Sequence, residues 1–214
     1  MAKIDNTSGV PEDEFMREGL IDRLAQYLEA EPDAWHIRYN LAVALLHDDR
    51  ADEALEQFHQ VLAQAPKHME SLVNIGGIHL SRGDAGEALK AFTKALSVWD
   101  VPMVRANLAV AYLQLGQLEQ GVDQLKRALE VNPHMPDALT NLGSAYIRLG
   151  QLDLAAEVSR QALELAPDFA MAHNNLAVVL QEQGDTAAAA EHASRAVELG
   201  YPVHSDLLAK LGLS

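Results

Sequence analysis

The side chains best suited to chemistry in this sequence are nine histidines, and their arrangement does not favour a metal centre. Two of them, His68 and His134, lie in the related segments PKHM and PHM, which are far apart in the chain. A transition-metal site needs several nitrogen, sulfur or oxygen ligands gathered in one place, and the chain contains no cysteine. We therefore predict that both histidines are exposed in turns, and that the chain holds no metal and no cofactor.

Motifs and charge exclude the common kinds of catalysis and several kinds of ligand. The sequence has no HExxH, no glycine-rich phosphate loop and no nucleophile elbow. Its formal charge of −15 would repel nucleic acid. No apolar run approaches the ~18 residues that span a bilayer, and the first residues lack the apolar core of a secretory signal. The sequence predicts a cytoplasmic protein that is not an enzyme and that neither binds nucleic acid nor inserts into a membrane.

The other recurrent polar side chain is an asparagine. The segments YNLAVALL, VNIGGIHL, ANLAVAYL, TNLGSAYI and NNLAVVLQ each carry one at their second position: Asn40, Asn74, Asn107, Asn141 and Asn175. Asparagine is a poor residue for a helix interior, because its side chain competes for backbone hydrogen bonds. Its amide can also donate to and accept from a peptide backbone. The recurrence therefore raises the question of which elements present these side chains.

Other residues repeat with a fixed period. Gly116, Gly150 and Gly184 are spaced by 34 residues, and so are Pro133 and Pro167. Aromatic residues are only 5% of the chain, and β-branched alternation is scarce, which favours an all-α fold. A period of 34 residues with two helical segments in each period is typical of stacked helical hairpins.

The repeating unit resembles the tetratricopeptide repeat (TPR). The segment 136–169 carries the residues of that pattern at Leu142, Gly143, Tyr146, Ala155, Ala162 and Pro167. The resemblance implies a right-handed superhelical solenoid of five TPR hairpins at 35–68, 69–101, 102–135, 136–169 and 170–203. The second unit is one residue short, and we expect Trp99 near its end to cover the core there.

The remaining segments are predicted to close the solenoid, since open-ended repeats need capping elements. Residues 12–34 are predicted to form an N-terminal capping helix, and residues 204–214 a C-terminal capping helix with Ser205 as its N-cap. Residues 1–11 are predicted to be a disordered tail.

The resemblance also implies a binding surface. In this family the first helix of each hairpin lines a concave groove, and the five asparagines would form a ladder along it. Packed helices are ~8–10 Å apart, and an extended chain rises ~3.3 Å per residue. An extended peptide in the groove would therefore meet one asparagine about every three of its residues. The predicted groove residues are the five asparagines with Val43, Val110, Ser144 and Arg148.

These residues leave two functions open. The first is a protein–protein interaction module that binds an extended or helical segment of a partner protein. The alternative is a structural scaffold that self-assembles into a homo-oligomer through its ends or convex face. The asparagines themselves could contact a ligand or only bond the neighbouring repeat. The carboxylate clamp of chaperone-binding family members is not expected, because only Asn74 matches its pattern.

Overall fold

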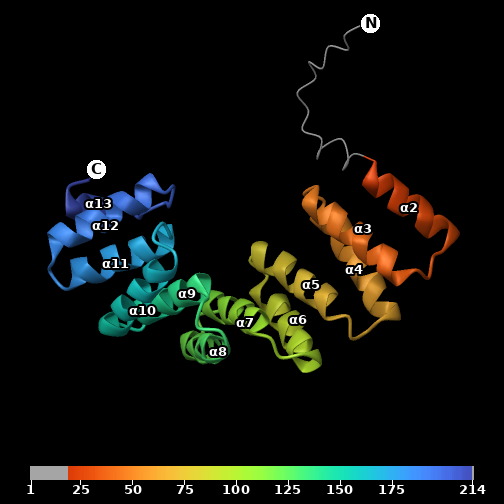
Figure 1. The fold of residues 1–214 in the computed structure, drawn as a ribbon, viewed down its shortest axis with the longest axis horizontal. Helices are drawn as coiled ribbons and strands as arrows, with labels where there is room; N and C mark the ends of the chain where they lie inside the picture. Colours follow the sequence, from red (N-terminus) through yellow and green to blue (C-terminus); the bar gives the residue numbers. More distant parts are fainter. Residues whose placement is uncertain (1–18, 214) are drawn as a thin grey trace, which may run out of the picture. The chain divides into compact units, whose positions relative to one another are not determined.

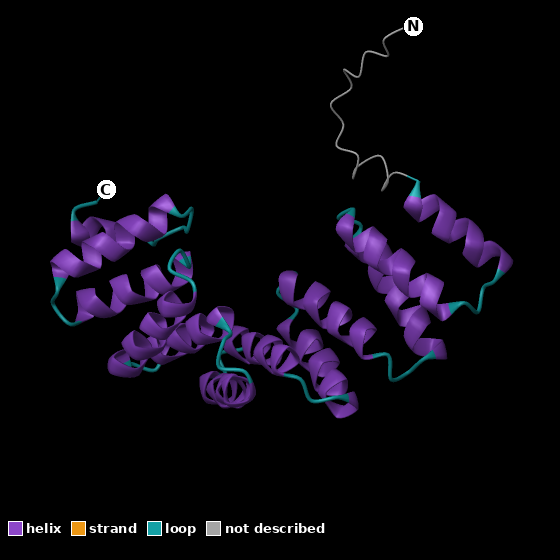
Figure 2. Ribbon diagram, viewed as in Figure 1, coloured by secondary structure: helices purple, strands orange, loops and turns teal. Residues whose placement is uncertain are grey.

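The structure, a computed structural model, describes residues 19–213, and every regular element in this part of the chain is a helix. The helices α2 to α13 follow one another with short turns between them (Figure 1), and no strand occurs among the described residues (Figure 2). The predicted all-α class is therefore confirmed. The chain divides into two compact units, one ending at Arg82 and one beginning at Gly83.

The first unit contains the four helices α2 (Leu20–Ala30), α3 (Trp35–His47), α4 (Ala51–Gln64) and α5 (Met69–Ser81). Helix α3 packs against both α2 and α4, and α4 packs against α5. Helix α2 falls inside the predicted capping segment 12–34 and buries Leu28. Residues 12–18 of that segment, and the predicted tail 1–11, lie outside the described residues.

The second unit contains α6 (Ala85–Val98), α7 (Pro102–Gln114), α8 (Leu118–Val131), α9 (Pro136–Arg148), α10 (Leu152–Leu165), α11 (Ala170–Glu182), α12 (Thr186–Glu198) and α13 (Ser205–Leu211). Each packs against the next. In addition, α7 contacts α9 and α9 contacts α11, whereas within this unit no comparable contact joins α8 to α10 or α10 to α12. The helices α7, α9 and α11 thus lie closer to one another than α8, α10 and α12 do. The face that α7, α9 and α11 form is therefore the concave face of this unit.

Five helices, which we call the A helices, share one register with the sequence period. They are α3, α5, α7, α9 and α11, and each has 13 residues. Each begins at the first residue of a predicted repeat, and the helix after each (the B helices α4, α6, α8, α10 and α12) follows a short turn.

The turns after the A helices depend on a left-handed residue, which is a glycine in four of the five repeats. Gly116 has φ 75°, and the N–H of Gln117 donates to the carbonyl of Tyr112 at 2.9 Å, which closes the last turn of α7. Glycine adopts this conformation without a Cβ clash. The first repeat uses Asp49 instead, the one non-glycine with positive φ (57°) in the described chain.

Small residues let the A helix and the B helix of one hairpin approach closely, as the first and third repeats show. The facing positions Ala42 and Ala54 are fully buried in the first repeat. Gly121 on α8 shows how close the contact is, because a Cβ added there would lie 2.6 Å from Cδ2 of Leu113 on α7. The close contact of α7 with α8 therefore depends on the absence of a side chain at Gly121.

Three local predictions are wrong. Trp99 does not cover the core, because it is 70% exposed in an extended residue after α6. His68 is not an exposed turn residue. Its ring packs against Trp35 and Tyr39, and its Nδ1 accepts the N–H of Ser71 at 3.2 Å as the N-cap of α5. In α13 the N-cap is His204, whose Nδ1 accepts the N–H of Asp206, and not Ser205.

Candidate functional site

The five asparagines occupy one register in the structure, since each is the sixth residue of its A helix. Their environments differ. Asn40 is exposed, whereas Asn74, Asn107 and Asn141 are half-buried. Asn175 is only 3% exposed. An identical position in the repeat therefore does not give these side chains an identical role.

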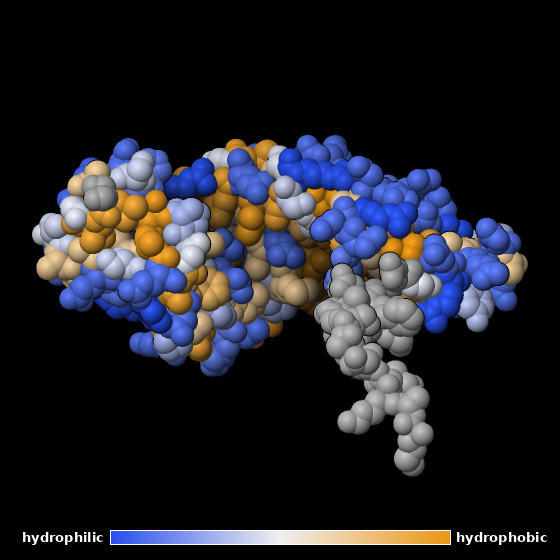
Figure 3. All heavy atoms as spheres, turned by 90° about the horizontal axis from the view of Figure 1, so that it is seen from above, coloured by the Kyte–Doolittle hydropathy of each residue, from blue (hydrophilic) through white to orange (hydrophobic). Residues whose placement is uncertain are grey.

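Asn107 and Asn141 lie on A helices of the concave face of the second unit. Neither side chain makes a hydrogen bond or ion pair with any described residue, and both keep part of their surface exposed. Val110, one turn after Asn107, is also half-buried. On the face of the molecule that Figure 3 draws, apolar surface is interspersed with polar surface. The two amides are thus available to a ligand on a partly apolar face.

Asn175 is engaged by the preceding repeat. Its Nδ2 donates to the carbonyl of Thr140 at 2.9 Å, and the hydroxyl of Ser144 donates to its Oδ1 at 3.2 Å. The room for this contact comes from Gly143, where an added Cβ would lie 3.1 Å from Nδ2 of Asn175. Asn175 and Ser144 therefore bond adjacent repeats, and we leave both out of the proposed contact set.

Arg148, the charged residue predicted at the groove edge, is also tied to its neighbour. Its Nη1 donates to the carbonyl of Leu113 at 2.8 Å. Leu113 lies in the last turn of α7, and its carbonyl also accepts the N–H of Gly116 at 3.1 Å. Arg148 thus links α9 to the end of α7, although the residue is exposed overall.

In the first unit, Asn40 and Val43 line a hollow of about 390 Å³ between α2 and α3. Its other lining residues are Leu20, Leu24, Tyr39, Ala44 and His47. The wall is mostly aliphatic, and the polar groups of Asn40 and His47 lie on the same helix about two turns apart. The hollow has the size and chemistry to accept one apolar side chain beside a hydrogen-bonding backbone.

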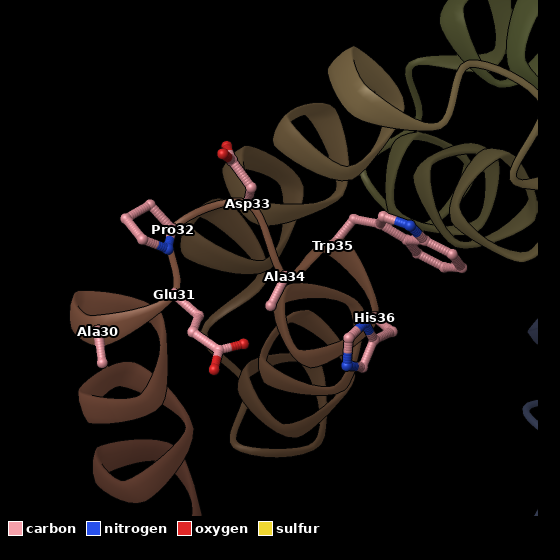
Figure 4. A pocket seen from close by; sticks show the side chains of 7 residues that line it. All are labelled: Ala30, Glu31, Pro32, Asp33, Ala34, Trp35 and His36. Carbon is pink, nitrogen blue, oxygen red and sulfur yellow. The ribbon is translucent and has the colours of Figure 1, made fainter.

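A second hollow, of about 590 Å³, lies beside the loop that joins α2 to α3 and is lined by residues 30–36 (Figure 4). The side chains of Glu31 and His36 extend to the same side of this loop, whereas the indole of Trp35 extends away from it (Figure 4). Its lining comes from one consecutive segment and contains no predicted groove residue. We assign it no binding role.

A polar link that was not predicted from the sequence recurs in alternate repeats at the fourth residue of the A helix. Arg38 on α3 donates to Oε1 of Gln57 on α4 at 2.8 Å and to the carbonyl of Pro32 at 2.8 Å. Arg105 on α7 donates to Oε1 of Gln124 on α8 at 2.7 Å and pairs with Asp100. Each such set has three members: the A-helix residue, its partner on the B helix, and its partner in the turn before the A helix. We call this set a hairpin link.

Repeat five has a hairpin link made of histidines. Nδ1 of His173 on α11 lies 2.9 Å from Nδ1 of His192 on α12, and Nε2 of His173 lies 3.0 Å from the carbonyl of Pro167. Burial, together with the charge of His173, lowers the pKa of His192. The A helices α5 and α9 carry buried leucines, Leu72 and Leu139, at the corresponding position. The i, i+19 spacing of the polar pairs was the sequence signal for this feature.

Two general properties of the described chain bear on function. Residues 19–213 contain no group of three or more histidine, cysteine or acidic side chains placed to hold a metal ion. None of their helices is long and apolar enough to cross a membrane.

Comparison with known proteins identifies the family. Sequence models of the tetratricopeptide repeat match residues 33–100, 107–168 and 140–200. These matches cover most of the chain, which therefore belongs to the tetratricopeptide repeat family. Both models describe the repeat, and neither describes a catalytic domain.

Individual relatives support the same fold. The chain is 30% identical over 111 residues to the CTR9 homolog of Arabidopsis thaliana, a match that covers 51% of this chain and 10% of that protein. The chain thus spans about a tenth of that curated relative. Among solved structures, the Cut9–Hcn1 complex aligns with TM-score 0.75 and 16% identity over 92% of this chain and 39% of that one. YrrB, described as a TPR protein with an unusual peptide-binding site, aligns with TM-score 0.69 and 21% identity over 87% and 96%.

Proposed function

We propose that this protein is a non-catalytic interaction module that binds a segment of a partner protein on its A helices. The proposal rests on Asn107 and Asn141. These amides occupy one register on the concave face of the second unit and have no hydrogen-bond partner among the described residues. A backbone that runs across α7 and α9 can donate to and accept from both.

The proposed ligand is an extended segment with apolar side chains and little net charge. The A helices with the residue that follows each carry no net charge together, so the chain's acidity lies elsewhere. Val110 provides apolar surface beside Asn107. In the first unit, the aliphatic hollow beside Asn40 accepts an apolar side chain. Each amide hydrogen bond would contribute ~0.5–1.5 kcal/mol to the binding free energy, and the apolar contacts would add to this.

The cytoplasmic location of the protein stays a prediction.

Selection from a random peptide library, followed by calorimetry, tests the proposal. The variant Asn107→Ala/Asn141→Ala should lower the affinity of selected peptides by about 5- to 150-fold, because two hydrogen bonds are worth ~1–3 kcal/mol. The matched control is Gln120→Ala/Gln161→Ala, which removes two exposed amides from the B helices α8 and α10. Equal affinity in both variants would remove the asparagines from the binding mechanism.

The alternative, a self-assembling scaffold, is favoured by a different observation. Trp99 and Val131 are 70% and 72% exposed, and a second copy of the chain could bury them. Sedimentation velocity across a range of concentrations separates the two functions. A chain that assembles as wild type and stays monomeric as Trp99→Ser/Val131→Ser would support the scaffold. A wild-type monomer at all concentrations would exclude it.

A further inference from the structure

We propose that His173 and His192 form a binding site for a divalent transition metal ion of the zinc class. The two imidazoles come from different helices of one hairpin, α11 and α12, and present their Nδ1 atoms to each other at 2.9 Å. No other pair of histidine rings in residues 19–213 has ring nitrogens in hydrogen-bond contact. The proposal does not depend on the proposed groove, because it concerns the link within one hairpin.

The two Nδ1 atoms are 2.9 Å apart, so they can share one ion once the rings turn and both lone pairs converge beside the line that joins them. An ion ~2.0–2.1 Å from both Nδ1 atoms would make an N–metal–N angle of about 90° at this separation. Opening the pair by about 0.4–0.5 Å would give the tetrahedral angle preferred by zinc. Both rings are only half-buried, so water can complete the coordination. The chain itself supplies two ligands.

The tautomer of His173 is the one that a metal ligand needs. Its Nε2 lies 3.0 Å from the carbonyl of Pro167, and a carbonyl can only accept, so Nε2 carries the proton. In the neutral ring, Nδ1 is then the free lone pair, directed at His192. Metal-binding histidines commonly donate their other N–H to a carbonyl in this way, which fixes the tautomer and the ring orientation.

His192 is suited to the same role. In the metal-free chain its Nδ1–H donates to Nδ1 of His173, and a bound ion would replace that shared proton. Burial and the neighbouring His173 lower the pKa of His192, which favours the neutral ring that a metal ion requires. The nearby charges oppose each other, since Arg160 disfavours a cation there and Glu191 favours one.

The other hairpin links show why histidine is informative at this place. In the first and third repeats the same position is filled by Arg38 with Gln57 and by Arg105 with Gln124. Those pairs join the A helix to the B helix and cannot bind a cation, because arginine has no acceptor. A purely mechanical link does not require imidazoles. The replacement of arginine and glutamine by two histidines adds metal-binding capacity to an otherwise equivalent contact.

The experiment titrates ZnCl₂ into the full, untagged chain by calorimetry. We expect saturable binding of one ion per chain, accompanied by a shift of the side-chain ¹⁵N resonances of His173 and His192. The variant His173→Arg/His192→Gln rebuilds the arginine–glutamine link and should keep the melting temperature while lowering zinc affinity at least about tenfold. The variant His134→Ala removes an exposed histidine and should bind zinc as the wild type does.

A second variant protects the test against misfolding. His192→Gln keeps an amide that donates to Nδ1 of His173 and removes one ligand, so it too should lose zinc affinity. The proposal is overturned if the wild type shows no saturable binding at millimolar zinc. It is equally overturned if the folded His192→Gln chain binds zinc as tightly as the wild type, because the ion would then be held by other residues.

Discussion

The contrast between Asn175 and Asn141 gives a sharp prediction, because the two residues share a repeat position and differ in their contacts. Asn175→Ala removes two hydrogen bonds from a side chain that is 3% exposed. Each is worth ~0.5–1.5 kcal/mol, and alanine returns a few tenths of a kcal/mol of helix propensity. We therefore expect a net loss of about 1–2.5 kcal/mol. Asn141→Ala removes no bond and should leave stability unchanged or slightly raised.

The assay must allow for stepwise unfolding, since repeat proteins need not unfold in one transition. Urea denaturation followed by circular dichroism gives the overall change, and hydrogen exchange of the α11 amides reports the local one. Gly143→Ala supplies a coupled perturbation, because its Cβ would lie 3.1 Å from Nδ2 of Asn175 and 2.9 Å from Oγ of Ser159. Its cost should be smaller in the Asn175→Ala background. Equal losses for Asn175→Ala and Asn141→Ala would refute the distinction between bonded and free asparagines.

Further predictions concern the hairpin links, the turns and the groove. Arg105→Ala should lower the free energy of unfolding in urea by ~1.5–3 kcal/mol, the range for hydrogen bonds to charged groups. The double variant Arg105→Leu/Gln124→Val copies the apolar pair of the fourth repeat and should recover most of that loss. The pKa of His192 is lower in the folded chain than its ordinary value of about 6.5. The free energy of unfolding should therefore be highest above about pH 6.5 and should fall as the pH drops through the folded-state pKa. His192→Gln should remove this contribution. Asp49→Gly should raise the melting temperature, because a residue with φ 57° costs less as glycine. Because the proposed ligand carries little net charge, peptide affinity should change little between roughly 0.05 and 0.5 M salt, a range over which electrostatic screening becomes strong.

The fold was predictable because it depends on local patterns that repeat. The 34-residue spacing of Gly116, Gly150 and Gly184 marks residues that take a left-handed conformation in the structure. The small residues mark contacts between helices, as Gly121 does against Leu113. Each pattern involves one residue type with one physical consequence, so the sequence alone indicates the register of every A helix.

The candidate site was less predictable, because the role of a polar side chain depends on its neighbours in the adjacent repeat. Asn175 is buried because Gly143 has no Cβ and Ser144 supplies a hydroxyl. In the preceding repeat the corresponding residues are Ala109 and Val110, which offer Asn141 neither space nor a partner. The hairpin links were missed for a similar reason, since their partners are 19 residues apart on facing helices.

The side-chain amide resonances of the asparagines test the central claim most directly. In ¹⁵N-labelled protein titrated with a selected peptide, the NH₂ signals of Asn107 and Asn141 should shift with the same saturation curve as binding. The signal of Asn175 should remain in place, because its amide already bonds Thr140. If the peptide binds and the signals of Asn107 and Asn141 do not move, the partner is held elsewhere and the proposed groove is wrong.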